Sequence, residues 1–169
     1  MAITTEGSVQ LTNQLAHPPV EMESNYIYGK LRVYRINFTQ GAAAGDANSF
    51  ARLIRLPAGK IMLLGTQCVL KISALGAARI VDIGWEAYRD KSGVVVAADP
   101  DGLVDGLVAT AATYTIFSVP PSGVAGAGIL ADTTKTFESS SGVVLAAQCT
   151  GDTLPAGATM QGLIVVAVE

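Results

Sequence analysis

Few residues in this chain of 169 could do acid–base or nucleophilic chemistry. His17 is the single histidine, so a Ser–His–Asp or Cys–His site would have to use it. The two cysteines, Cys68 and Cys149, lie in apolar, strand-like stretches, which favours buried free thiols over a disulfide or a catalytic role. Zinc-ligand spacing and the glycine motifs that bind nucleotide phosphates do not occur. We therefore expect a protein that is not an enzyme and has no metal ion or cofactor.

One acidic segment has a spacing that calcium sites use. Asp99, Asp101 and Asp105 lie in the segment DPDGLVDG, where carboxylates two and four residues apart accompany a glycine. An EF-hand loop would need a third ligand before its glycine and a glutamate at its end, and both are missing. We interpret the segment as a loop in which Asp starts the turn, Pro100 sets φ and Gly102 takes a positive φ. Whether this loop binds an ion stays open.

Charge is distributed unevenly along the chain, although the net charge is only −3. Residues 1–29 carry three acidic groups, residues 30–91 carry ten basic and four acidic groups, and residues 92–169 carry one basic and seven acidic groups. Either strands from these segments interleave and neutralise one another, or the protomer is polarised and its basic patch faces an acidic partner. The residues expected to bind a partner are Tyr26, Tyr28, Arg32, Arg35, Arg52 and Arg55.

The composition excludes several classes of protein. Hydrophobic residues make up 50% of the chain and charged residues 15%, which is not the composition of a disordered protein. An isoelectric point near 5.1 provides no basic field for nucleic acid. No apolar run approaches the roughly 20 residues of a membrane-spanning helix, and the first residues do not resemble a secretion signal. A soluble chain with so little charge must cover apolar surface, which predicts self-association or docking on a larger assembly.

Turn residues divide most of the chain into short segments with the composition of β-strands. The predicted strands are residues 30–39, 50–56, 60–64, 67–73, 79–89, 94–98, 113–119, 135–139, 143–149 and 160–168. No amphipathic helix of three turns is predicted. Short strands separated by glycine and proline turns are typical of a sandwich or barrel, so we predict an all-β, jelly-roll-like β-sandwich formed by residues 29–169.

Residues 1–28 are predicted to form an extended N-terminal arm. They are polar, lack periodicity and contain Pro18-Pro19, which favours extended geometry. Either the arm is a disordered tail, or it becomes ordered against a neighbouring molecule. The second alternative would explain why Tyr26, Ile27 and Tyr28 are more apolar than a free tail usually is.

Two predicted strands carry more detailed expectations. In residues 30–39 the apolar side chains change face between Val33 and Tyr34, which predicts a bulge or a strand buried on both sides. In residues 79–89, Trp85 alternates with Ile83, so Trp85 is predicted to be buried. Tyr88 points the other way and is expected in the core or at a subunit interface.

The segments FARLIRLPAGKIMLLGTQCVLKIS (50–73) and ARIVDIGWEAYRDKSGVVVAADPDGLVDGL (78–107) resemble structural proteins of tailed-bacteriophage virions, and most of all capsid decoration (cement) proteins. The resemblance implies a symmetric oligomer, most often a trimer, which binds the major capsid protein on the outside of an icosahedral head after synthesis in the host cytoplasm. It brings no catalytic residues.

Two alternatives remain. Tail and neck proteins of phages have a similar character, so the position on the virion is open. A receptor- or glycan-binding β-sandwich module is the other alternative, and it predicts exposed aromatic side chains in loops. The predicted loops 40–48 and 120–128 contain no Trp or Tyr, which counts against such a module.

Overall fold

The computed structural model describes residues 30–117 and 134–169, and this part of the chain is built almost entirely of antiparallel β-strands. The predicted arm, with Tyr26 and Tyr28, and the predicted loop 120–128 lie outside the described residues. Within the described ranges, no helix is long and apolar enough to cross a membrane. The predicted all-β class is confirmed.

The first layer, sheet A, contains six strands. They are β1 (Lys30–Thr39), β4 (Gly59–Leu64), β5 (Val69–Ile72), β10 (Thr113–Ile116), β11 (Thr134–Ser139) and β14 (Thr159–Val168). β14 pairs with β1 on one side and with both β4 and β5 on the other. The 3-10 turn η1 (Gly65–Gln67) separates β4 from β5, so these two strands form one interrupted line along β14. β10 and β11 form a second interrupted line beside it, which makes sheet A four lines wide.

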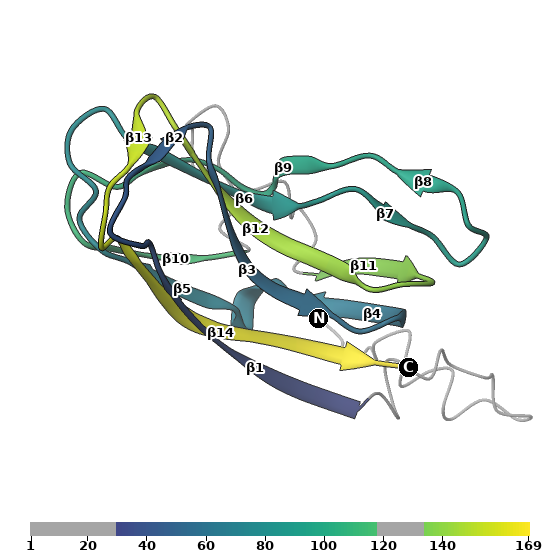
Figure 1. The fold of residues 1–169 in the computed structure, drawn as a ribbon. Helices are drawn as coiled ribbons and strands as arrows, with labels where there is room; N and C mark the ends of the chain where they lie inside the picture. The colour runs from purple at the N-terminus through teal and green to yellow at the C-terminus, as the bar shows by residue number, and fades with distance from the viewer. Residues whose placement is uncertain (1–29, 118–133) are drawn as a thin grey trace, which may run out of the picture.

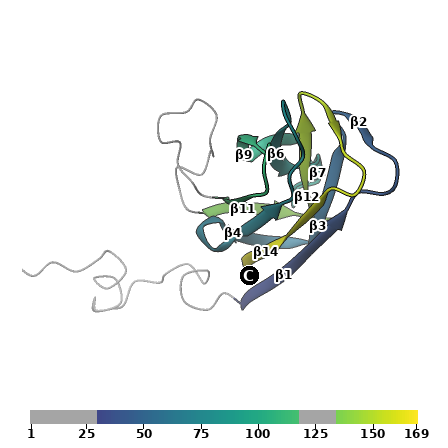
Figure 2. The same ribbon diagram turned by 90° about the vertical axis from the view of Figure 1, so that its left-hand side faces the viewer.

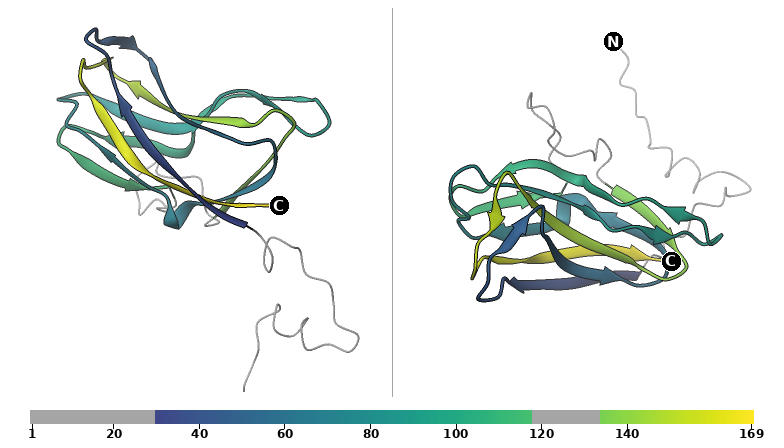
Figure 3. Two further views of the ribbon diagram at one scale, coloured as in Figure 1. Left: turned by 60° about the horizontal axis from the view of Figure 1, so that its bottom comes forward. Right: turned by 45° about the horizontal axis from the view of Figure 1, so that its top comes forward.

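The second layer, sheet B, contains β3 (Phe50–Leu56), β12 (Val143–Thr150), β6 (Ile80–Trp85) and β9 (Asp99–Val108), in that spatial order. Two short strand pairs complete the fold. They are β2 (Gly45–Ala47) with β13 (Thr153–Leu154), and β7 (Tyr88–Arg89) with β8 (Val95–Val96). These pairs lie at opposite ends of the sandwich (Figures 1 and 3).

The path of the chain between the two sheets is that of a jelly roll. The chain runs from β1 in sheet A to β3 in sheet B, back to β4 and β5, and then to β6 and β9 in sheet B. It returns through β10 and β11 to sheet A, crosses to β12, and ends in β14 between its earlier neighbours. Figure 2 shows β6, β9 and β12 above β4, β14 and β1. The predicted jelly-roll topology is therefore confirmed.

The core lies between the two sheets and follows the period-two alternation of the strands. In β12, Val143, Leu145, Ala147 and Cys149 are buried in alternation. Both cysteines are buried and free, as predicted.

Aromatic rings close one end of the core. Trp85 is buried and packs edge-on against Phe137, with the ring centroids 5.3 Å apart. The predicted burial of Trp85 is confirmed. Tyr88 is half-buried and also packs edge-on against Phe137, so it belongs to the border of the same core.

The prediction of a loop in the segment DPDGLVDG (residues 99–106) is wrong. Asp99–Val108 forms β9, which pairs with β6 along sheet B. Asp99 is opposite Trp85 and Val104 is opposite Ile83, so residues 100–103 bulge out of the ladder. The turn chemistry of Pro100 and Gly102 therefore marks a bulge, because sheet pairing over long sequence distance overrides a local turn preference.

The prediction for residues 30–39 is also corrected. The pairing of β1 with β14 is continuous from Lys30 opposite Val168 to Thr39 opposite Thr159, without a bulge. Leu31 and Val33 are not buried: they are 65% and 61% exposed on the side of sheet A that faces away from sheet B. We call this side the outer face of sheet A. Leu31 and Val33 therefore belong to an exposed apolar surface and not to the core.

Candidate binding face on sheet A

The four arginines predicted to form a basic patch are divided between the two sheets. Arg52 and Arg55 lie on β3 in sheet B, where Arg52 Nε donates to Glu86 and Arg55 Nη2 donates to the carbonyl oxygen of Ser141. Arg32 and Arg35 lie on β1 in sheet A, and neither makes an ion pair within the described residues. Arg32 and Arg35 are three residues apart on β1, so they project from opposite faces of the strand. Partner binding by all four arginines stays a prediction.

The basic and acidic blocks of the sequence interleave, as the first of the two alternatives for charge predicts. Three ion pairs join residues 30–91 to residues 134–169. They are Lys60 with Glu169 at 3.3 Å, Arg79 with Asp152 at 2.9 Å, and Lys91 with Glu138. A jelly roll brings strands from distant parts of the chain together, so charges that are separate in sequence become neighbours in space.

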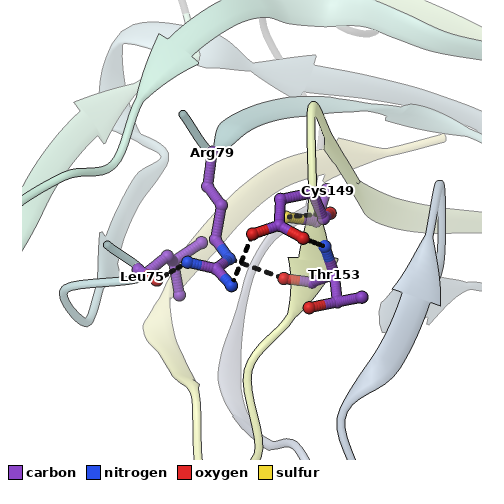
Figure 4. Close-up of polar contacts among 5 residues, drawn as sticks. Leu75, Arg79, Cys149 and Thr153 are labelled. Atoms are coloured by element: carbon purple, nitrogen blue, oxygen red, sulfur yellow. Dashed lines mark hydrogen bonds and ion pairs between the residues drawn. The ribbon is translucent and has the colours of Figure 1, made fainter. Parts of the chain in front are cut away.

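Arg79 holds three segments together at the β2–β13 end of the sandwich (Figure 4). Its Nε donates to the carbonyl oxygen of Thr153 at 2.6 Å, its Nη1 donates to the carbonyl oxygen of Leu75 at 2.8 Å, and its Nη2 lies 2.9 Å from Asp152 Oδ2. Burial is the main reason that the pKa of the nearby Cys149 thiol is raised, so the thiol stays protonated near neutral pH. The arrangement stabilises the fold and has no activated nucleophile.

The aspartates of β6 and β9 gather at the edge of sheet B. Asp82 accepts hydrogen bonds from the Gly106 N–H at 2.8 Å and from Thr150 Oγ1 at 3.2 Å. Burial, followed by neighbouring aspartates, raises the pKa values of Asp99 and Asp105. No group of His, Cys, Asp or Glu side chains within residues 30–117 and 134–169 could hold a metal ion.

The outer face of sheet A carries a contiguous apolar patch. Its exposed members are Leu31, Val33, Val69, Tyr114, Ile116 and Leu163. In the strand register Leu163 is opposite Val69, Val69 is opposite Ile116, and Val33 is opposite Val165, diagonally next to Leu163. Leu31 and Tyr114 lie two residues from Val33 and Ile116 on the same face. We call these six residues the outer apolar patch.

A hollow of about 610 Å³ adjoins this patch. The side chains that give it chemical character are Arg35, Asn37, Lys71, Tyr114, Gln161 and Leu163. Gln161 Nε2 donates to Asn37 Oδ1 at 3.3 Å, and Lys71 Nζ lies 5.6 Å from the centroid of the Tyr114 ring. Two cations, two amides and an exposed aromatic ring can together bind an anionic or polar ligand.

Sequence reasoning found only Arg35 among the polar residues of this hollow. Lys71, Tyr114 and Gln161 come from three different strands, so no sequence spacing connects them. Polar–apolar alternation would have misplaced Tyr114, because in Thr113–Ile116 the polar Thr115 is buried while Tyr114 and Ile116 are exposed.

No protein-family model matches the chain, and no curated protein matches it significantly. Among solved structures, the chain is similar to a chain of the capsid asymmetric unit of cyanophage Pam1, with a TM-score of 0.48 and 10% identity, over 83% of this chain and 86% of that chain. It is also similar to a chain of infectious bursal disease virus, Gx strain, with a TM-score of 0.45 and 12% identity, over 82% of this chain and 32% of that chain. At these identities the likeness is one of backbone fold.

Proposed function

We propose that this chain is a non-enzymatic structural protein of a tailed-phage virion, which decorates and stabilises the capsid shell as a symmetric oligomer. The observation that carries the proposal is the outer apolar patch, a set of exposed large side chains that are neighbours across four strands. Contiguous apolar surface of this kind marks interaction sites, because leaving it in water costs free energy.

Two further observations support a role in assembly. Assembly proteins need broad surfaces that bind at many equivalent positions, and the jelly roll is an architecture that viral capsid and lectin domains use. The resemblance of residues 50–107 to phage virion proteins favours the capsid role over the lectin role. The surface distinguishes this role from others, because one fold serves many functions.

Oligomeric state in solution is the first test. Light scattering of the wild type should give a multiple of the protomer mass of 17.4 kDa, and a trimer is expected. Leu163→Asp with Ile116→Asp should lower the mass, because each places a charge in the covered patch. The control is Val94→Asp with Val95→Asp, which changes residues of similar chemistry that lie outside the patch and are at least as exposed. A wild type that is monomeric at all concentrations and does not bind shells would contradict the proposal.

The particle itself provides the second test. Quantitative mass spectrometry of purified virions should find many copies of the chain per particle. Electron microscopy should place these copies on the outside of the head, and shells without the chain should open at lower temperature. Density in the tail or neck would favour the alternative position, and a particle without the chain would overturn the virion role.

A receptor- or glycan-binding module is the second candidate, and the hollow beside Tyr114 favours it. The Tyr114 side chain is 66% exposed beside Lys71, and exposed rings of this kind stack on ligands. Tyr114 lies on strand β10, whereas a binding module of this kind was expected to expose aromatic side chains in loops. If Tyr114→Ala removes glycan or receptor binding while the oligomer mass stays unchanged, the module replaces the assembly role as the primary function.

A further inference from the structure

The outer edge of β1 is the longest unpaired strand edge of the described sandwich that has a continuous register. β1 has ten residues, contains no proline and pairs in unbroken register with β14 on one side only. No described strand pairs with its other edge. Long, regular edges of this kind accept a further strand readily, because their N–H and C=O groups point outward in a row.

The side chains of β1 limit which strand can add there. Lys30, Arg32 and Arg35 are exposed, and β1 contains no acidic residue. Pairing of β1 with the β1 of a second copy would bring three cations from each copy into one ribbon, which like-charge repulsion disfavours. The apolar Leu31 and Val33 alternate with Arg32, so the complementary strand should alternate apolar and acidic residues.

The chain contains such a segment before β1. Residues 20–23 read Val-Glu-Met-Glu, which alternates two apolar and two acidic side chains, and residues 1–29 contain no lysine or arginine. When the two segments are paired, Val20 and Met22 can contact Leu31 and Val33 while the glutamates face Lys30 and Arg32. The charge and the period of this segment both match the edge.

We propose that residues 20–23 of a second copy add to the free edge of β1 and extend sheet A by one strand. This inference rests on the proposed function, since it assigns the surface that joins the copies. Pairing within one chain is the main competitor. A loop formed by residues 24–29 would bring residues 20–23 beside residues 30–33 of the same chain. The predicted self-association favours the edge of a neighbour, and disulfide trapping distinguishes the two arrangements.

Disulfide trapping in the full-length chain tests the geometry. A Val20→Cys variant is mixed with a Val33→Cys variant under mild oxidation, and a disulfide between the two different chains is expected, because the register that sets the glutamates opposite Lys30 and Arg32 also sets residue 20 opposite Val33. The native thiols are buried and free, so wild type mixed with either variant controls for background. Val95→Cys replaces Val33→Cys as the positional control, since both valines are well exposed. A disulfide that forms only within one Val20→Cys/Val33→Cys chain, or no disulfide at all, overturns the proposal.

Charge reversal tests the energetics. Lys30→Glu with Arg32→Glu, and separately Glu21→Lys with Glu23→Lys, should each raise the concentration of half-assembly by about tenfold. The four changes combined should restore assembly, because the charges are then exchanged. Lys91→Glu, which changes an exposed lysine of the β7–β8 hairpin, should leave assembly unchanged. If the wild type is an oligomer but neither pair of changes affects assembly, this inference fails and the proposed function stands. If the wild type neither self-associates nor binds shells, both fail.

Discussion

At the scale of single residues, Trp85 shows how one buried side chain organises an end of the sandwich. Its ring packs edge-on against Phe137, and Lys135 Nζ lies 4.4 Å from the ring centroid. Position 102, in the bulge of β9, must be a glycine, because a Cβ on Gly102 would overlap the Trp85 ring. The indole Nε1 is buried and has no hydrogen-bond partner among the described residues, so the contribution of Trp85 comes from packing.

Trp85→Ala is therefore expected to lower the free energy of unfolding by about 3–5 kcal/mol. Trp85→Phe should cost clearly less, because it keeps most of the ring contact and removes an N–H that makes no hydrogen bond here. Urea denaturation of both variants checks this, with Phe50→Ala as the control, since Phe50 is exposed. An equal loss in the two Trp85 variants would contradict the packing argument.

Because of Cys68, the free energy of unfolding should depend on pH in the alkaline range. Burial raises the pKa of its thiol to about 11, and the hydrogen bond from the Val165 N–H lowers it by less. In the unfolded chain the thiol ionises at about pH 8.5. Above that pH the unfolded state therefore releases a proton that the folded state keeps. The stabilisation is complete below about pH 8.5 and is lost as the pH rises toward 11, by an amount on the order of 3 kcal/mol.

The measurement is the free energy of unfolding of the wild type and of Cys68→Ala between neutral pH and pH 11. Other groups also titrate in this range, so the test is the difference between the two curves. The wild-type curve should fall more steeply. Parallel curves would mean that the Cys68 thiol ionises equally well in both states.

At the scale of elements, the contact between β6 and β9 depends on Gly84. A Cβ on Gly84 would overlap the carbonyl oxygen of Asp99, so the two strands can approach only because this position has no side chain. We expect Gly84→Ala to destabilise the fold by more than 2 kcal/mol, roughly the cost of forcing backbone apart in a packed sheet. Thermal unfolding checks this. Gly41→Ala is the matched control, because a Cβ on Gly41 meets no atom within 4 Å and it should leave stability nearly unchanged.

The β2–β13 end depends on Arg79 in a comparable way. Arg79→Gln removes the donors to Leu75 and Thr153 and leaves their carbonyl oxygens without this partner, so we expect a loss of about 2–3 kcal/mol. Arg52→Gln is the control: Arg52 is exposed and bonded to Glu86, and its loss should not be measurable in the same denaturation experiment. Faster amide exchange at Thr153 in Arg79→Gln would locate the effect, whereas equal stability of the two variants would refute it.

At the scale of the whole molecule, the jelly roll predicts a spectroscopic result. The described residues contain strands and one 3-10 turn, so far-UV circular dichroism should show a strand spectrum. A helical double minimum from the full chain would be incompatible with a sandwich that forms most of it. The same sample should unfold cooperatively, since both sheets contribute to one core.

Much of this fold could be predicted because alternation and turn residues are local signals. Residues 30–39 and 50–56 were predicted with the bounds of β1 and β3, and 143–149 differs from β12 by one residue. β9 was missed because Asp, Pro and Gly favour turns, while its strand character comes from pairing with β6. Trp85 could be assigned to the core from alternation alone, but Lys71, Tyr114 and Gln161 could not be assigned to one site.

The sequence by itself therefore determined the all-β class, the buried thiols and the shortage of charge that calls for a covered surface. Each of these depends on composition or on near neighbours in the chain, whose physical effects act over a few residues. Only the tertiary structure decided that Leu31 and Val33 face outward, that Arg35 meets Lys71 and Tyr114 around one hollow, and that Arg52 belongs to the other sheet. These facts depend on which strands pair and in which register, and a shift of one residue would move every side chain of a strand to the opposite face.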